Sequence, residues 1–439
     1  MERTIIEKLN EWKNSKRRKP LILRGARQVG KTWILERFGE SFKDGFLRID
    51  LEKQKEYRQL FEQTKEIPRI LTNISMASGK KITTDTLLIL DEIQSCPDAL
   101  NSLKYFCEDA SEYYVAAAGS LLGITLAEGF PVGKVDFLEL APMTFEEFLL
   151  ADGKANLVEY MKTKDSFTNI SDAFFLPLTE KLKEYFIVGG MPEPVLYWTE
   201  DKNIMTAERA QENILLSYES DFGKHIPASD VPKTLLIWNS LPSQLAKENK
   251  KFLYSAVKSG ARAREYENAL NWLIHADLVK KTGRITKAAL PVSAYEDNSA
   301  FKIYMLDIGL LRKHSRLDRS VFTEGNRLFI EFNGALTENY VLQSLLRQTD
   351  RPYYWAEQPH EVDFVFQYGN EIYPVEVKAG KNIESASLKA YLKKYPETPL
   401  AIRFSLRNLS FDGKVLNIPL FMADETSRLI GLAKQIKTA

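Results

Sequence analysis

The stretch that decides the fold of the first part of this chain is Gly25-Ala26-Arg27-Gln28-Val29-Gly30-Lys31-Thr32. It fits the pattern G-x-x-x-x-G-K-[ST], in which glycines let the backbone curl and point its N–H groups at phosphates. An apolar run at 20–23 precedes it, and helical spacing at 32–38 follows it. A helix start adds partial positive charge to such a loop. The context favours a phosphate-binding loop over an ordinary strand–helix turn.

Two side chains of this loop have defined tasks in such a site. Lys31 is expected to reach the β- and γ-phosphates of ATP, and the Thr32 hydroxyl is expected to ligate Mg²⁺. All eight loop residues are predicted to line the nucleotide. The predicted cofactors are therefore ATP and Mg²⁺, and the predicted activity is ATP hydrolysis.

A second motif is Leu87-Leu88-Ile89-Leu90-Asp91-Glu92, a buried strand that ends in two carboxylates. The carboxyl edge of a parallel sheet is where such groups meet a phosphate loop. Asp91 is expected to hold Mg²⁺ through its water shell, and Glu92 to polarise the attacking water as a base. A solvated strand end is the alternative, and the loop about 60 residues upstream favours the functional interpretation.

The apolar run at 113–118 indicates a third strand, followed by Gly119-Ser120. Ser120 is a candidate sensor that would hydrogen-bond the γ-phosphate or the attacking water. A simple turn at these two residues is the alternative, and both stay open.

Strands that alternate with helical stretches predict an α/β fold with a mainly parallel sheet and helices on both faces. The length of 439 residues suggests several domains. We expect an ATPase domain at 1–150 and a helical lid or linker region at 151–230. Three helices and a basic hairpin at 231–312 suggest a winged helix, and an α/β domain is expected at 313–439.

Composition narrows the class of protein. Hydrophobic residues make up 44% and charged residues 27% of the chain, which is usual for soluble domains. Apolar runs fall short of the roughly 20 residues that span a bilayer, and residues 1–19 are mostly polar, so we expect a cytoplasmic protein without membrane contact. Two cysteines and four scattered histidines argue against a disulfide framework or a zinc enzyme. A net charge of +1 means that any nucleic-acid contact must use local patches.

One such patch surrounds residues 266–278, which have the apolar spacing of a recognition-type helix. The basic residues around this helix are Arg262, Arg264, Lys280, Lys281 and Arg284. They could neutralise DNA phosphates. A winged helix that only packs between domains explains the same pattern, and the two interpretations weigh evenly.

A fourth motif lies between Glu361-Val362-Asp363 and Val375-Glu376-Val377-Lys378, with twelve residues separating Asp363 from Glu376. Tyr368-Gly369-Asn370 indicates a hairpin turn between two strands. Side chains alternate along a strand, so Glu376 and Lys378 share a face that Asp363 can join.

Two carboxylates on one face can hold Mg²⁺, while Lys378 steadies the attacking water or the developing charge. Glu338, on an expected helix at 334–346, is a candidate for a further acidic contact. The predicted metal ligands are thus Glu338, Asp363 and Glu376 here, and Thr32 and Asp91 at the first site.

Several motifs together resemble a prokaryotic AAA+ "predicted ATPase" family. They are the G-x-R-Q-V-G-K-T loop, L-D-E-I-Q at 90–94, L-A-P-M-T-F-E-E-F at 140–148, G-G-M-P-E at 189–193 and F-K-I-Y-M-L-D-I-G-L at 301–310. The resemblance implies an N-terminal AAA+ module and a C-terminal PD-(D/E)XK, restriction-endonuclease-like domain. Many relatives carry Gly-Arg where this chain has Gly133-Lys134, so activation of a neighbouring subunit from this position is in doubt.

Two functions follow from the resemblance. In one, ATP hydrolysis positions DNA for a metal-dependent nuclease site with Asp363, Glu376 and Lys378. In the other, the ATPase is a nucleotide-controlled switch, and the C-terminal domain binds DNA or a protein partner without cutting. The AAA+ resemblance also implies a homo-oligomer, with a hexamer as the expected form.

Overall fold

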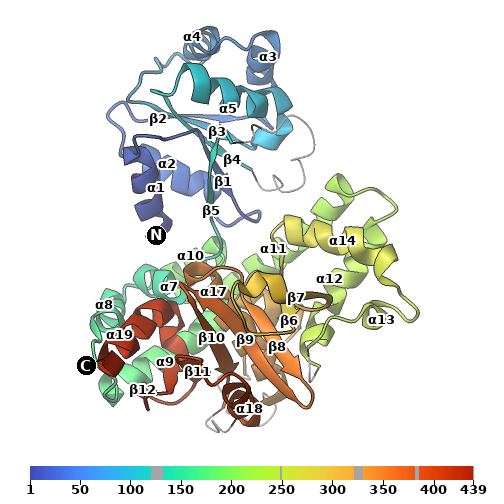
Figure 1. Ribbon diagram of the computed structural model, residues 1–439. Helices are drawn as coiled ribbons and strands as arrows, with labels where there is room; N and C mark the ends of the chain where they lie inside the picture. The colour runs from blue at the N-terminus through green and yellow to red at the C-terminus, as the bar shows by residue number, and fades with distance from the viewer. Residues whose placement is uncertain (120–130, 132, 248–249, 321–329, 381–384, 439) are drawn as a thin grey trace. The chain divides into compact units, whose positions relative to one another are not determined.

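The structure is a computed structural model that describes residues 1–119, 131, 133–247, 250–320, 330–380 and 385–438. The chain divides into two compact units (Figure 1). The first contains residues 2–141 and 275–278, and the second contains 142–274 and 279–439 with Met1. No helix in these ranges is long and apolar enough to cross a membrane.

The first unit contains a five-stranded sheet with the order β2-β3-β4-β1-β5. Its strands are β1 Leu21–Arg24, β2 Phe46–Asp50, β3 Leu87–Asp91, β4 Tyr114–Ala118 and β5 Asp136–Glu139. All neighbouring strands are parallel, which confirms the predicted α/β class. Because these strands are parallel and only β4 lies between β1 and β3, the carboxyl ends of β1 and β3 lie close to one another at the same edge of the sheet.

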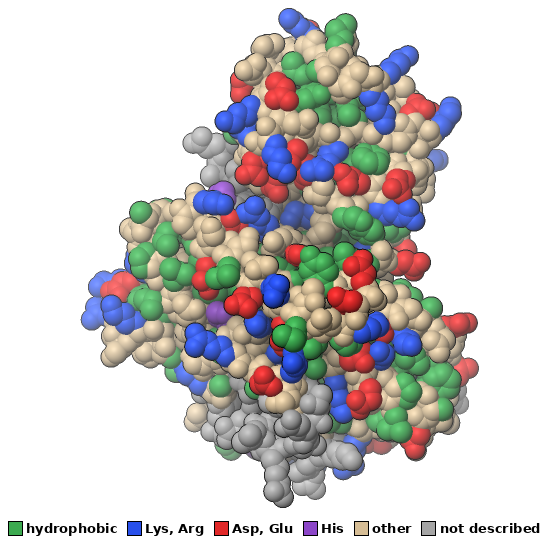
Figure 2. Space-filling view, turned by 180° about the vertical axis from the view of Figure 1, so that it is seen from behind, with side chains coloured by type: hydrophobic (Ala, Val, Ile, Leu, Met, Phe, Trp, Pro, Cys, Tyr) green, Lys and Arg blue, Asp and Glu red, His purple; other side chains and the backbone are tan. Residues whose placement is uncertain are grey.

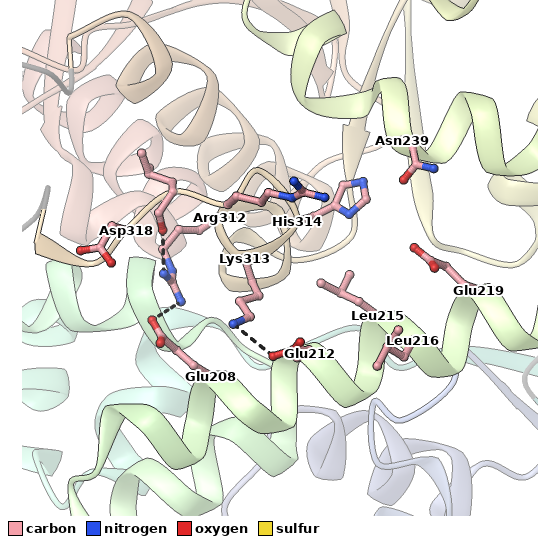
Figure 3. A pocket seen from close by; sticks show the side chains of 12 residues that line it. Glu208, Glu212, Leu215, Leu216, Glu219, Asn239, Arg312, Lys313, His314 and Asp318 are labelled. Carbon is pink, nitrogen blue, oxygen red and sulfur yellow. Dashed lines mark hydrogen bonds and ion pairs between the residues drawn. The ribbon is translucent and has the colours of Figure 1, made fainter.

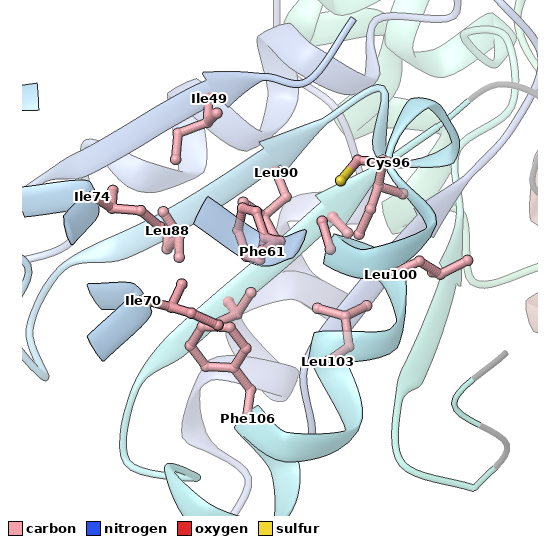
Figure 4. Close-up of a cluster of buried hydrophobic side chains, with 14 of the residues drawn as sticks. Ile49, Phe61, Ile70, Ile74, Leu88, Leu90, Cys96, Leu100, Leu103 and Phe106 are labelled. Atoms are coloured by element: carbon pink, nitrogen blue, oxygen red, sulfur yellow. The ribbon is translucent and has the colours of Figure 1, made fainter. Parts of the chain in front are cut away.

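Helices cover both faces of this sheet. Their bounds are α1 Ile5–Asn14, α2 Lys31–Gly39, α3 Lys55–Gln63, α4 Ile67–Ser78 and α5 Pro97–Asp109, with a 3-10 turn η1 Ile93–Ser95. Phe61, Ile70 and Phe106 of α3, α4 and α5 pack with Leu88 of β3 in one buried cluster (Figure 4). On β4, Val115 belongs to this cluster, whereas the ring of the preceding Tyr114 contacts Trp12 of α1. Successive side chains of β4 therefore point to opposite faces of the sheet, one covered by α3, α4 and α5 and the other by α1.

The second unit contains an eight-stranded mixed sheet with the order β12-β13-β11-β10-β9-β8-β6-β7. Its strands are β6 Val279–Ile285, β7 Glu296–Met305, β8 Tyr353–Glu357, β9 His360–Tyr368, β10 Glu371–Val377, β11 Ala401–Ser405, β12 Ser410–Phe411 and β13 Val415–Pro419. β9 and β10 form the predicted antiparallel hairpin, with Tyr368 opposite Glu371. Gly369 in its turn has φ +61°, a left-handed conformation that suits glycine.

Helices make up most of the rest of this unit. They are α7 Phe145–Ala151, α8 Ala155–Thr163, α9 Asp172–Val188, α10 Pro192–Asp201, α11 Ile204–His225, α12 Val231–Leu245, α13 Tyr254–Val257, α14 Ala263–His275, α15 Ile308–His314, α17 Ile330–Gln348, α18 Ala386–Lys394 and α19 Thr426–Thr438, with 3-10 turns η2 Val292–Tyr295 and η3 Leu420–Glu425. α7 falls in this unit, and its Phe145 and Phe148 rings contact Tyr185 of α9. The last residues of the predicted range 1–150 thus pack with the second unit.

The sheet also joins two ranges that the sequence treats as separate domains. β6 and β7 come from 231–312, yet β6 pairs in parallel with β8, with Arg284 opposite Tyr354. The predicted boundary at 312–313 therefore lies between strands of one sheet. A parallel pairing between strands about 70 residues apart leaves no local pattern, so periodicity could not reveal it.

Candidate functional site

The loop before α2 needs its glycines for two different reasons. Gly25 has φ +145°, and a Cβ there would lie 2.0 Å from the Leu140 carbonyl oxygen. Gly30 has φ +94° and is the residue from which α2 begins. Gln28 also has a positive φ of 67°. A tightly curled backbone that ends at a helix N-terminus is the geometry that a phosphate-binding loop requires.

Lys31 lies over this loop. Its Nζ donates to the carbonyl oxygens of Gly25 at 2.9 Å and Ala26 at 2.8 Å. Burial lowers the pKa of Lys31 to about 8, although the charges of Glu92 and Asp91 act in the opposite direction. The predicted phosphate-binding ammonium is therefore placed at the loop with two acidic groups nearby.

The two predicted Mg²⁺-holding groups of the first unit meet directly. Thr32 Oγ1 donates to Asp91 Oδ2 at 2.9 Å, and Asp91 is 3% exposed. Arg48 Nε donates to the same carboxylate oxygen at 3.0 Å and also pairs with Glu36. The sequence analysis missed Arg48, although a single arginine in the short strand β2, directly beside β3, could have indicated it.

Glu92 follows Asp91 at the strand end and has φ +49°. Burial raises the pKa of Glu92, while a hydrogen bond from Gln94 and the charge of Lys31 act to lower it. A carboxylate with a raised pKa beside the loop suits the predicted general base. Arg27 is close enough to act electrostatically on both Lys31 and Glu92. Ser120, the candidate sensor, lies outside the described residues.

Arg3 is a further residue at this loop that the sequence did not reveal. Its guanidinium donates to the Val29 carbonyl at 3.2 Å and to the Ala141 carbonyl at 2.6 Å. Arg3 is 6% exposed. It thus ties the phosphate-binding loop to the chain that follows β5. Lys134 forms an ion pair with Glu108 at 2.8 Å.

The second unit brings the predicted acidic residues together. Glu338 lies on α17, Asp363 on β9 and Glu376 on β10. Asp363 Oδ2 accepts from the Val377 amide at 2.8 Å, and Lys378 Nζ pairs with Glu376 Oε1 at 2.7 Å. Burial raises the pKa of Asp363 well above its usual range, and the charges of Glu338 and Glu376 raise it further. The predicted set is therefore one electrostatically connected cluster.

One oxygen of this cluster has no hydrogen-bond partner in the part of the chain that is described. Glu376 Oε2 is buried and unpaired, and the residue is 5% exposed. An unpaired buried carboxylate oxygen is costly, and a cation would satisfy it. Asp363 and Glu376 on adjacent strands therefore fit a divalent ion.

Glu338 is engaged differently. Lys250 Nζ donates to its Oε1, and the Tyr304 hydroxyl donates to its Oε2 at 3.2 Å. Burial alone would raise the pKa of Glu338, but Lys250 and Lys302 outweigh burial and lower it. Lys302 is fully buried and bonds Glu361 Oε1 at 2.5 Å. Lys302 and Tyr304 belong to the F-K-I-Y motif, and their spacing of two on one strand could have indicated a shared face.

Neither site is a closed metal cage. In the described ranges, no three His, Cys, Asp or Glu side chains are grouped so that they could hold a metal ion. Mg²⁺ keeps several waters and is bound through one or two carboxylates plus substrate phosphates. The pairs Thr32–Asp91 and Asp363–Glu376 are therefore compatible with Mg²⁺ in the presence of a phosphate ligand.

The basic residues near α14 are only partly available. Arg262 and Arg264 are exposed, whereas Arg284 pairs with Asp297 and Lys281 lies 4.6 Å over the Phe301 ring. On the face shown in Figure 2, basic and acidic side chains are interspersed. This distribution agrees with the net charge of +1.

A cavity of about 480 Å³ lies elsewhere in the second unit, between α11 and α15 (Figure 3). Arg312 pairs with Glu208 at 2.9 Å and Lys313 with Glu212 at 3.4 Å across it. None of the predicted site residues lines this cavity. Four of its charged side chains are therefore paired across the cavity.

Comparison with known families matches three segments of the chain. Residues 17–149 match a family described as an AAA domain. Residues 179–320 and 333–421 match two families described as domains of unknown function, DUF8612 and DUF4143. The sequence has no match among curated proteins.

Among solved structures, the chain matches the Walker-type ATPase PABY2304 of Pyrococcus abyssi. It is 14% identical with a TM-score of 0.43, and the match covers 70% of this chain and 94% of that one. The RuvB Holliday junction branch migration motor of Thermotoga maritima is 16% identical with a TM-score of 0.29. This match covers 64% of this chain and 90% of that one. The parallel sheet, the loop geometry and the AAA-domain match together support an AAA-type P-loop ATPase.

Proposed function

We propose that this protein is an ATP-hydrolysing AAA+ protein that acts on DNA and carries a second, metal-dependent nuclease-like site. The observation that carries the ATPase is the meeting of Thr32 and Asp91 at 2.9 Å beside the loop that Lys31 covers. These groups combine a phosphate-binding cation with two oxygen ligands for Mg²⁺.

In the proposed hydrolysis, the curled loop and the start of α2 bind the phosphates through backbone N–H groups. Lys31 leaves the loop carbonyls and pairs with the β- and γ-phosphates, while Thr32 and Asp91 are the residues that would hold Mg²⁺. Bound Mg²⁺ would supply neutralisation of the developing phosphate charge. Glu92 accepts a proton from the attacking water, and its partly buried position favours that transfer.

At the second site, Asp363 and the unpaired Glu376 Oε2 would hold one divalent ion. Bound Mg²⁺ would there polarise a phosphodiester and a water. Lys378, now paired with Glu376 at 2.7 Å, lies where it can orient that water or stabilise the charge that develops on phosphorus. This proposal assigns cutting to residues that are separate from the phosphate loop.

A second candidate function is a nucleotide-controlled switch whose C-terminal region binds DNA or a protein partner without cutting. The lysine pairs favour it, because Glu338, Glu361 and Glu376 each have a lysine partner. Such an ion-pair network also occurs at purely structural positions.

DNA contact would use local charge. Arg264 on α14 and Arg262 just before it are exposed and can neutralise phosphates. The AAA+ resemblance also implies a homo-oligomer, with a hexamer as the form to test.

The experiment that tests the ATPase is phosphate release by the purified protein with Mg²⁺, with Lys31→Ala as the matched variant. Turnover in the parent and its loss in the variant support the proposal. Equal turnover in both proteins contradicts it.

A further inference from the structure

Glu338 is held by two side chains that come from outside its own helix. Lys250 donates to Oε1 and the Tyr304 hydroxyl to Oε2 at 3.2 Å. The residue is 4% exposed, so these two donors largely replace water around its carboxylate. Both oxygens of this predicted metal ligand thus have a partner, whereas Glu376 Oε2 has none in the described ranges.

Lys250 belongs to the described segment 250–253, which directly precedes α13 and positions this lysine. The neighbouring Phe252 donates its amide to the Phe301 carbonyl at 2.8 Å, and the two rings stack with centroids 5.3 Å apart. Phe301 directly precedes Lys302 on β7. This anchor fixes the backbone of the segment beside the carboxylate cluster and leaves the flexible stem of Lys250 to reach Glu338.

Lysines, together with Glu248, lie next to Lys250 in the sequence, and Lys250 is partly open to solvent. Lys247 and Lys251 flank Lys250, and the Lys250 side chain is 14% exposed against 5% for Glu338. An ammonium on a flexible stem can exchange a carboxylate for a phosphate as its partner. A polyanion that approaches this segment therefore competes with Glu338 for Lys250.

We propose that Lys250 is a substrate-responsive counter-ion, which pairs with Glu338 until a phosphate of bound DNA takes its place. Glu338, which in the described residues is not grouped with Asp363 and Glu376 as a ready three-carboxylate site, is then released to turn toward the divalent cation that those two residues hold. Departure of Lys250 removes the ammonium that bonds Glu338 directly and leaves only the charge of Lys302 to act on it. A buried carboxylate that loses its bonded partner gains from a new cation, so departure of the lysine and arrival of the cation are coupled. This exchange of partners rests on the proposed metal-dependent site. It makes tight binding of the metal depend on the presence of a DNA phosphate backbone.

The coupling is reciprocal, because a ligand that strengthens metal binding must itself be bound more tightly when the metal is present. It also separates two kinds of ligand at the site. Asp363 and Glu376 would bind the ion with or without DNA, whereas Glu338 would contribute only in the ternary complex.

Mn²⁺ binding to the full-length protein without nucleotide, measured by electron paramagnetic resonance, tests this inference. The sites that disappear in Glu376→Gln identify the C-terminal metal. Lys250→Ala should bind this Mn²⁺ more tightly by about tenfold, comparable to effects of residues around metal ligands. Lys250→Arg, which keeps the positive charge, should stay near the parent affinity.

Two further arms guard against a variant that merely disturbs folding. In a Glu338→Gln background, Lys250→Ala should give no gain, since the carboxylate that it releases is gone. A DNA duplex of about 30 base pairs should increase the affinity for Mn²⁺ more in the parent than in Lys250→Ala. Mn²⁺ that binds to the DNA itself is measured with the Glu376→Gln protein and subtracted.

The outcomes separate this inference from the function on which it rests. If Glu376→Gln removes Mn²⁺ but Lys250→Ala binds no more tightly than the parent, the counter-ion role is wrong and the metal site stands. If Glu376→Gln removes no Mn²⁺ from any form of the protein, the metal site and the counter-ion role fall together.

Discussion

Thr32 and Asp91, which are 59 positions apart in the sequence, are joined by a hydrogen bond of 2.9 Å from the hydroxyl to Oδ2. The strand order explains the contact, because only β4 separates β1, which leads into the loop, from β3, which ends at Asp91. The fold thus brings a loop residue and a strand-end carboxylate to one point beside Lys31.

The affinity for ATP should depend on the charge of Lys31. Since burial lowers the pKa of this lysine to about 8, its ammonium is present below that pH and is lost as the pH rises through it. Phosphate binding needs the charged form, so the Kd for ATP should rise by up to about tenfold per pH unit above pH 8. Titrations with a fluorescent ATP analogue would show this. Lys31→Arg should remove the dependence, because guanidinium stays charged; a flat parent profile would contradict the assignment.

Glu92→Gln should bind ATP but hydrolyse it slowly. The amide keeps the shape of the side chain but cannot accept the proton of the attacking water. Loss of a general base commonly costs on the order of 10²–10⁴-fold in rate. Single-turnover hydrolysis and ATP binding, measured on the same protein, separate the two effects. Turnover at the parent rate would show that Glu92 is not the base.

The first site was largely predictable from the sequence, because its signals are local. The glycines at 25 and 30 and the strand that ends at Asp91 are each visible within a few residues, and the structure places them as expected. Arg3 and Arg48 were missed, since each reaches the site from another element through contacts that leave no spacing pattern.

The second site was predicted only in part. Its hairpin was visible from strand alternation and the Tyr368-Gly369-Asn370 turn, and the structure confirms it. Lys250 and Lys302 were not predicted as members, because they reach the carboxylates from the range assigned to a winged helix. Their place depends on tertiary pairing of β6 with β8, which a single sequence does not show.

Assembly should depend on nucleotide. In the AAA+ architecture that the first unit resembles, sites usually lie between subunits, so ATP should favour an assembly of about six copies. Light scattering of Glu92→Gln with ATP, which should hold the bound state, measures this. A monomer at micromolar concentration with ATP present would favour the switch function instead.

The two chemical sites should be separable by substitution. Lys378→Ala should reduce metal-dependent DNA cleavage by at least about 10²-fold, because it removes a charge beside the reacting water. Its ATP turnover should match the parent, since Lys378 is part of neither the phosphate loop nor β3. Parallel assays of both activities on one preparation test this, with Lys389→Ala, an exposed lysine on α18, as the matched control. Parent-level cleavage by Lys378→Ala would remove it from the mechanism.

The central claim is that one chain carries an ATPase and a metal-dependent site that cuts DNA. The most direct measurement is cleavage of linear, branched and single-stranded DNA by the purified protein with Mg²⁺ or Mn²⁺, with and without ATP, beside Glu376→Gln. The account predicts cleavage by the parent that needs the metal and disappears in Glu376→Gln, while ATP hydrolysis persists in both proteins. Absence of cleavage of every substrate with either metal, despite active ATP hydrolysis, would contradict the nuclease and leave the C-terminal region as a binding module.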